Sequence, residues 1–148
     1  MQRRFLASLR APMILPLLLV CFSLTLTGCG KKKLSTYPVS GEVFVDGKPA
    51  VGAEVIFYPV NDPTPQAYPA ATVGTDGSFH VTTYSMNDGA PPGDYTITIV
   101  WAETKKEPGE DPIVGPDKLK GQYSTPTRST LKATIQKAKT QLPRYDLK

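Results

Sequence analysis

The sequence has few of the residues that build metal sites, disulfides and catalytic triads. Its 148 residues include one histidine, His80, and two cysteines, Cys21 and Cys29. A single histidine excludes a zinc site of the Cys/His type and leaves no familiar catalytic triad unless a second chain supplies residues. We therefore expect a chain without enzyme activity, without a bound metal and without a cofactor.

Both cysteines lie in the amino-terminal region, which has the pattern of an export signal. Three arginines precede the uncharged run 11–26, which proline interrupts and which is shorter than the roughly 20 residues of a membrane-spanning helix. The last four residues of this region, Leu26-Thr27-Gly28-Cys29, resemble the bacterial lipobox. The resemblance implies a lipoprotein signal peptide over residues 1–28 and attachment of lipid, palmitate included, to Cys29. The alternative is a simple secretory signal followed by an ordinary cysteine.

Lipid on Cys29 implies a membrane partner. Residues 29–36 are polar and short, and we interpret them as a lipidated tether. Two or three acyl chains make release from a bilayer negligible, because each buried CH₂ group contributes about 0.8 kcal/mol. Lys31, Lys32 and Lys33 are expected near anionic head groups or in solvent as part of a plain tether. Gly30 stands where an aspartate signals retention in the inner membrane, so the outer membrane is favoured over the inner one.

The formal net charge of +4 overstates how basic the folded part is. The chain has 17 Lys and Arg against 13 Asp and Glu. Removing the three arginines of the signal leaves 14 against 13, or +1, and setting aside Lys31–Lys33 leaves 11 against 13, or −2. No basic patch remains that predicts a nucleic-acid partner.

Alternating apolar residues between turn signals predict seven β-strands in residues 37–148. Asp46-Gly47 and Asp76-Gly77 are strong turn signals, because Gly adopts a positive φ and Asp bonds its own backbone. The predicted strands are residues 37–45, 53–59, 70–74, 78–84, 94–101, 131–136 and 142–147. Residues predicted to face inward are Val39, Val43, Val45, Val55, Phe57, Phe79, Val81, Thr83, Tyr95, Ile97, Ile99, Trp101, Leu131, Ala133 and Ile135. Short strands with this punctuation indicate an antiparallel β-sandwich in one domain.

Two long loops are the places where function is expected. Residues 61–69 hold three prolines, and residues 102–130 are unusually long for a connection inside a compact domain. Within the second loop, Pro116–Gly121 has the pattern of one helical turn. Its charged residues indicate a solvated loop or, as the alternative, a partner surface: Glu103, Lys105, Lys106, Glu107, Glu110 and Asp111.

Short motifs in a fixed order resemble a known family. They are the segments 39–43 (VSGEV), 46–50 (DGKPA), 52–55 (GAEV), 75–79 (TDGSF) and 92–95 (PGDY). In this order they resemble the carboxypeptidase regulatory-like domain, and residues 119–147 are similar to the ending of small bacterial lipoproteins that carry this domain. The resemblance implies a seven-stranded transthyretin-like (prealbumin-like) sandwich without catalysis. Hydroxyisourate hydrolases share that fold, but their several histidines and their chain ending are missing here.

Other side chains have a structural and a functional interpretation. His80 alternates away from Phe79 and is expected to be exposed. Asp46, Asp76, Asp88 and Asp94 lie mostly at turns, where they bond the backbone; a calcium site is the alternative. Four tyrosines are either packed at strand rims or form a platform that stacks on sugars: Tyr58, Tyr68, Tyr84 and Tyr123.

These observations predict a membrane-anchored, non-catalytic lipoprotein of the cell envelope. Its β-sandwich is expected to have a structural or protein-interaction role, with an envelope protein or a glycan as the partner. The alternative is a carbohydrate- or peptide-binding module that uses the loops 61–69 and 102–130. An enzyme that depends on a partner chain is the least supported interpretation.

Overall fold

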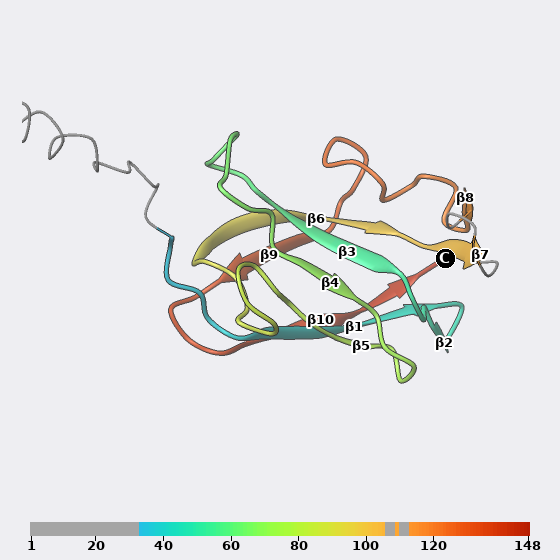
Figure 1. The fold of residues 1–148 in the computed structure, drawn as a ribbon, viewed down its shortest axis with the longest axis horizontal. Coiled ribbons are helices and arrows are strands. Elements are labelled where there is room, and N and C mark those ends of the chain that lie inside the picture. Colours follow the sequence, from blue (N-terminus) through green and yellow to red (C-terminus); the bar gives the residue numbers. More distant parts are fainter. Residues whose placement is uncertain (1–32, 106–108, 110–112) are drawn as a thin grey trace, which may run out of the picture. The chain divides into compact units, whose positions relative to one another are not determined.

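The structure consists of strands, turns and loops, and the described residues contain no helix (Figure 1). The computed structural model describes residues 33–105, 109 and 113–148. Lys33–Lys148 form one compact unit. The predicted signal peptide, Cys29 and the first part of the predicted tether lie outside the described residues. Within the described part of the chain, no helix is long and apolar enough to cross a membrane.

The first sheet is antiparallel throughout. Its order is β4 (Ala70–Thr72), β3 (Glu54–Pro59), β6 (Gly93–Val100) and β9 (Lys132–Ile135). The register places Phe57 opposite Ile97 and Tyr95 opposite Ala133. Alternate residues of β3 and β6 therefore present one continuous apolar face.

The second sheet is organised around β1 (Val39–Val45). β10 (Thr140–Leu147) pairs with β1 in parallel, while β2 (Lys48–Pro49) and β5 (Ser78–His80) pair with it in antiparallel fashion. The turn between β1 and β2 is the predicted Asp-Gly turn, because Asp46 and Gly47 have φ angles of 49° and 75°. Positive φ at both central residues is the requirement of a type I′ hairpin turn.

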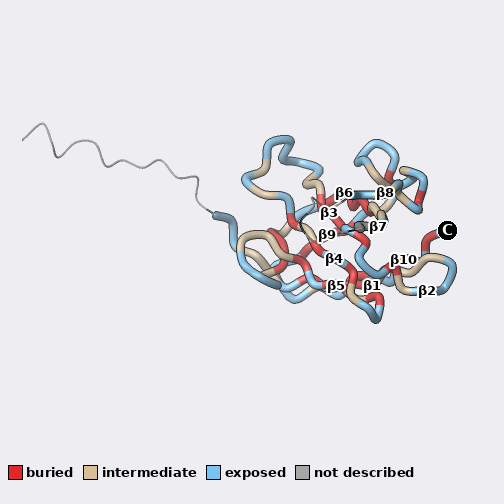
Figure 2. Tube along the Cα trace, turned by 45° about the vertical axis from the view of Figure 1, so that its right-hand side comes forward, coloured by how far each residue is buried: buried red, intermediate tan, exposed pale blue. Residues whose placement is uncertain are grey.

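The two sheets face each other around one apolar core. The rings of Phe57 in the first sheet and Phe79 in the second have centroids 6.5 Å apart, so the sheets are in contact. The buried residues of this core lie along strands of both sheets, β1 and β10 in one and β3 and β6 in the other, and are red in Figure 2. The all-β prediction is confirmed, and the arrangement is that of a sandwich.

The segment 102–130 is more ordered than the predicted loop. It contains a separate two-stranded ribbon of β7 (Ala102–Lys105) and β8 (Ile113–Asp117). The helical turn predicted for Pro116–Gly121 is wrong, because β8 extends to Asp117 and consecutive turns follow. The Asp117 carboxylate accepts the backbone N–H groups of Trp101, Leu119 and Gly121 at 2.9, 3.1 and 2.9 Å, which fixes this turn against the end of β6.

The strands differ from the prediction in three further ways. The described residues form ten strands rather than seven, since β2, β7 and β8 were not predicted. The pairing of β1 with β10 is parallel, whereas all strands were predicted to be antiparallel. Thr96 and Thr98, on the face of β6 opposite to its residues predicted to point inward, are also buried. Lys132 covers Thr96 with a hydrogen bond from Nζ to Oγ1 of 2.6 Å, and the chain between 123 and 131 bonds the backbone of Ile97 and Ile99.

Most residues predicted to face inward are in the core. Eleven of the buried residues come from that set: Val39, Val43, Val55, Phe57, Phe79, Val81, Tyr95, Ile97, Ile99, Ala133 and Ile135. Val45, Trp101 and Leu131 are partly buried and pack against the core. Thr83 is also half-buried, because β5 ends at His80 and the chain has already turned there.

Substituting Gly41 with alanine tests how tightly the second sheet packs. A Cβ atom at Gly41 meets the Phe79 ring at 2.6 Å and Leu142 Cβ at 3.2 Å, so the core has to shift. We expect Gly41→Ala to lower the free energy of unfolding by about 1–3 kcal/mol, measured by urea denaturation. Glu42→Ala, one residue along β1 on its outer face, is the control and is expected to change it by less than about 0.5 kcal/mol. Equal effects of the two substitutions contradict this packing.

Candidate ligand-binding pocket

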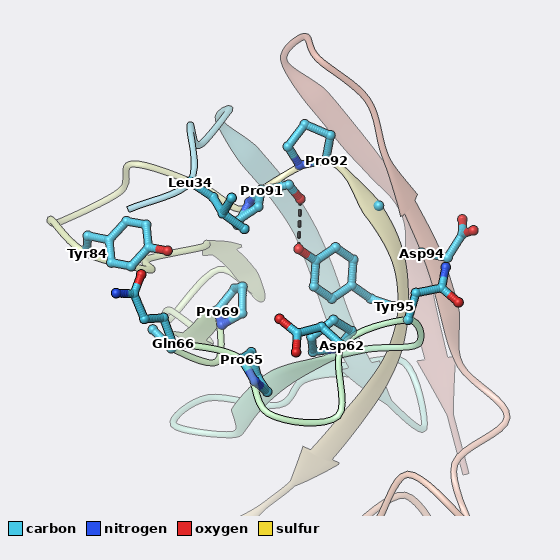
Figure 3. A pocket seen from close by; sticks show the side chains of 14 residues that line it. Leu34, Asp62, Pro65, Gln66, Pro69, Tyr84, Pro91, Pro92, Asp94 and Tyr95 are labelled. Atoms are coloured by element: carbon cyan, nitrogen blue, oxygen red, sulfur yellow. Dashed lines mark hydrogen bonds between the residues drawn. The ribbon is translucent and has the colours of Figure 1, made fainter. Parts of the chain in front are cut away.

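A pocket of about 230 Å³ lies where the β3–β4 loop meets the start of β6. The segment before β6 contributes Pro91 and Pro92, and the loop contributes Asn61, Asp62, Pro65, Gln66, Ala67 and Pro69. Leu34 and Tyr84 close the remaining side (Figure 3). The predicted functional loop 61–69 is thus part of a pocket.

The β3–β4 loop is held by ring stacking and backbone bonds. Tyr58 and Tyr68 stack across the base of the loop with ring centroids 4.9 Å apart. The N–H of Phe57 donates to the carbonyl of Pro69 at 2.9 Å. At the tip, the Asp62 carboxylate accepts the backbone N–H of Thr64 at 3.1 Å, which closes a local turn. The three prolines further restrict this loop, because each fixes its own φ.

Tyr95 forms an inner wall of the pocket and also belongs to the core. Its ring contacts Phe57 edge-on, with centroids 6.0 Å apart, and its hydroxyl donates to the carbonyl of Pro91 at 2.8 Å (Figure 3). Burial raises the pKa of Tyr95 to about 12, with a smaller contribution from Tyr84. The phenol therefore stays neutral and fixes the position of Pro91.

Asp88 organises the loop that presents Tyr84. Its carboxylate accepts the backbone N–H groups of Thr83, Tyr84 and Ser85 at 2.7, 3.1 and 3.1 Å. Burial of the carboxyl acts to raise its pKa, but these donors outweigh it and lower the pKa below the usual value. The structural interpretation of this residue, bonding to local backbone, is the one the geometry supports.

Two carboxylates line the pocket, and they differ in direction. The Asp94 carboxylate accepts a hydrogen bond from Thr134 Oγ1 at 2.6 Å and so links β6 to β9. The Asp62 carboxylate is turned toward the pocket interior in Figure 3, while Asp94 points away from it. At the rim, the Lys33 ammonium lies 5.2 Å from the centroid of the Tyr84 ring.

The remaining acids singled out in the sequence are dispersed. Asp46 lies in the β1–β2 turn, and Asp76 bonds the N–H and hydroxyl of Ser78 at 3.0 and 2.7 Å, which lower its pKa. Among the residues that the structure describes, no three His, Cys, Asp or Glu side chains come together. The four acids proposed as alternative calcium ligands therefore do not share one site. His80 is exposed on β5, as predicted.

The four tyrosines and the second long loop, 102–130, do not come together at one site in the described structure. Tyr84 lines the pocket, Tyr58 and Tyr68 stack on each other, and Tyr123 packs against the core. No residue of the 102–130 segment lines the pocket, so the two loops do not form one site in the described structure. In that segment Lys118 pairs with Glu103 at 3.0 Å and lies 4.5 Å from the Trp101 ring centroid. Lys106, Glu107, Glu110 and Asp111 lie outside the described residues.

Sequence reasoning missed several pocket residues. Leu34 was assigned to the tether, Pro91 was given no role, and Asp62 was included only as part of the loop 61–69. The only sequence signal was the proline content of residues 61–69 and 91–92, which indicates rigid loops but not that they meet.

Comparisons with known proteins assign no family. No family model and no curated protein matches the chain. Among solved structures, the chain is similar to a 9R-lipoxygenase from Cyanothece PCC8801, with 11% identity and a TM-score of 0.43. The alignment covers 80% of this chain and 18% of the lipoxygenase chain, so the chain spans less than a fifth of that protein. A likeness of this size assigns neither a fold family nor an activity.

Substitutions of Asp88 test how the pocket loop is held. Asp88→Ala leaves three N–H groups without their acceptor, and we expect it to lower the free energy of unfolding by about 1–3 kcal/mol. Asp88→Asn keeps one acceptor and is expected to fall between alanine and wild type. Because the folded-state pKa is lowered, the advantage of wild type over asparagine is present above pH 3.8 and shrinks as the pH falls further. Urea denaturation at several pH values measures this; a pH-independent difference contradicts it.

Tyr95 and Tyr145 are expected to lose their phenolic protons at a higher pH than an ordinary tyrosine. Burial raises the pKa of Tyr95 and of Tyr145 to about 12, from an ordinary value of 10.0. The stability that their neutral phenols contribute is present below pH 10 and is lost as the pH rises toward 12. Phenolate absorbance should show two of the seven tyrosines titrating late in the native protein and none in denaturant. Tyr145→Phe should remove one late step without loss of stability, because the Tyr145 hydroxyl has no partner among the described residues.

Proposed function

We propose that this chain is an exported lipoprotein, anchored by lipid on Cys29, whose β-sandwich acts without catalysis in the cell envelope. The observation that carries the proposal is the lipobox-like sequence Leu26–Cys29 after a basic and then apolar segment. The compact unit begins at Lys33, a few residues after that cysteine. An anchor directly before a compact all-β unit is the organisation expected of such a lipoprotein.

The placement of the short motifs supports a carboxypeptidase regulatory-like domain of transthyretin-like topology. Asp46-Gly47 lies in the β1–β2 turn, and Asp76-Gly77 precedes β5. Gly52, with a φ of 79°, lies in the turn before β3, and Gly93-Asp94 opens β6. Each motif thus has the role that a turn signal has in that domain. The proposed topology adds the small β2 and the β7–β8 ribbon to the seven predicted strands.

A role in binding follows from the pocket rather than from the fold. The domain presents an apolar pocket with one inward-turned carboxylate beside its amino-terminal segment. This favours an interaction role over a purely structural one. The alternative of a carbohydrate- or peptide-binding module applies in a narrower form, with the 61–69 loop and the segment 84–95 as the site and without residues 102–130. The proposed location is the outer membrane in an organism that has one, because Gly30 follows Cys29.

Substitution of Cys29 tests the anchor in growing cells. Cys29→Ala should abolish labelling with palmitate and release the protein from the membrane fraction, because the thiol that receives lipid is gone. Cys21→Ser, inside the predicted signal peptide, is the matched control and should keep both the label and the membrane association. Retention of label and membrane association by Cys29→Ala contradicts the proposal.

A further inference from the structure

The pocket beside Leu34 is lined by acidic residues and by no basic ones among the residues that the structure describes. Among its fourteen lining residues, all of them described, two are aspartates and none is Lys, Arg or His. Asp94 accepts a hydrogen bond from Thr134 and points away from the pocket. The Asp62 carboxylate accepts the backbone N–H of Thr64 through Oδ1 and turns into the pocket. A group that enters therefore meets the Asp62 carboxylate, and the nearest basic residue the structure places at this site is Lys33, at the rim over Tyr84.

The walls are apolar and match a hydrocarbon stem. Pro69, Pro91 and the ring of Tyr95 are buried, and Leu34 and Pro65 complete the walls. The Tyr95 hydroxyl is already occupied by Pro91. The volume of about 230 Å³ is below the roughly 300–1,000 Å³ of pockets that hold whole drug-sized ligands. The space suits a single long side chain.

The aromatic rim of the pocket already holds an ammonium group. Lys33 Nζ lies 5.2 Å from the centroid of the Tyr84 ring, within the range of a cation–π interaction. Tyr84 is in turn fixed by the Asp88 carboxylate. This contact shows that an ammonium group can lie over the aromatic ring at the rim.

We propose that the pocket binds the side chain of a lysine or arginine presented by a peptide segment of a partner protein. The cationic head pairs with Asp62, and the aliphatic stem packs on Pro69, Pro91 and Tyr95. A bilayer is a poorer occupant, because anionic head groups are repelled by Asp62 and Asp94 even though Leu34, Val60 and Tyr68 are exposed nearby. Only the location of the partner in the envelope depends on the proposed function; the chemistry of the pocket does not.

Two short peptides distinguish the contribution of the ammonium group to binding from that of the aliphatic stem. The full chain, purified in a non-ionic detergent, is titrated with acetyl-Gly-Lys-Gly-amide and with the norleucine analogue, which keeps the four-carbon stem but lacks the ammonium. Binding is followed by the NMR shifts of backbone amides. The lysine peptide should bind at least about tenfold more tightly and should perturb Leu34, Asp62 and Tyr84. Equal affinities, or shifts confined to other parts of the domain, overturn the proposal.

Charge-neutralising variants locate the interaction at one carboxylate. Asp62→Asn keeps an acceptor for the N–H of Thr64, so the loop should stay folded while lysine-peptide affinity falls about tenfold. Asp46→Asn makes the same charge change in the β1–β2 turn, where asparagine also tolerates a positive φ, and should leave the affinity unchanged. Equal loss in both variants overturns the proposal, as does lack of binding by wild type.

The same preparation separates this proposal from its rivals. If a neutral oligosaccharide binds and perturbs Leu34 and Tyr84 and the lysine peptide does not bind, a glycan is favoured and the basic-peptide proposal is overturned. If vesicles with anionic lipids perturb the same amides and the lysine peptide does not bind, a bilayer is favoured and the proposal is likewise overturned. Failure of Cys29→Ala to release the protein concerns the anchor alone, and peptide binding is measured without it.

Discussion

The contact of Phe57 with Phe79 and Tyr95 is the packing on which the rest of the structure depends. Phe57 lies in the first sheet and Phe79 in the second, so their contact joins the two layers. Tyr95 extends the same cluster to the pocket, where its hydroxyl positions Pro91. No cysteine lies between residues 33 and 148, so no disulfide shares this task within the unit. Aromatic burial of this kind contributes about 0.5–1.5 kcal/mol per ring pair beyond the area removed from solvent.

The pocket and the hydrophobic core therefore share residues and are stabilised by the same packing. Tyr95, a core residue, forms the inner wall of the pocket, and its hydroxyl donates to Pro91. The other walls include prolines, whose φ angles are fixed. The surrounding loops are closed by the Asp62 and Asp88 carboxylates, which accept backbone N–H groups. Such a site needs little ordering when a ligand enters, which preserves affinity in a small pocket. The charged group turned inward, the Asp62 carboxylate, then favours ligands of positive charge.

Local sequence patterns predicted the strands and turns, but they could not predict contacts between distant segments. Alternation located β1, β3 and β6, and Asp46-Gly47 located a type I′ turn, because both depend on neighbouring residues. The β7–β8 ribbon was missed, because Pro116 and Gly115 are typical of loops. Burial of Thr96 and Thr98 depends on coverage of β6 by the chain after residue 122, which spacing does not reveal. The loop 61–69 was a predicted site, but its meeting with Leu34 and Pro91 is set by tertiary packing.

The parallel pairing of β1 with β10 has a consequence for the order of events during biosynthesis. Ser40 Oγ donates to Gln141 Oε1 across this pair, a separation of 101 residues. β2 and β5 pair with β1 earlier in the chain, but the edge of β1 that pairs with β10 lacks its neighbour until the last strand has been made. Contacts between such remote segments raise the contact order and slow folding, because a long loop has to close first. The second sheet is therefore complete only after β10 has been synthesised, whereas its β1–β2 hairpin needs only residues close in sequence.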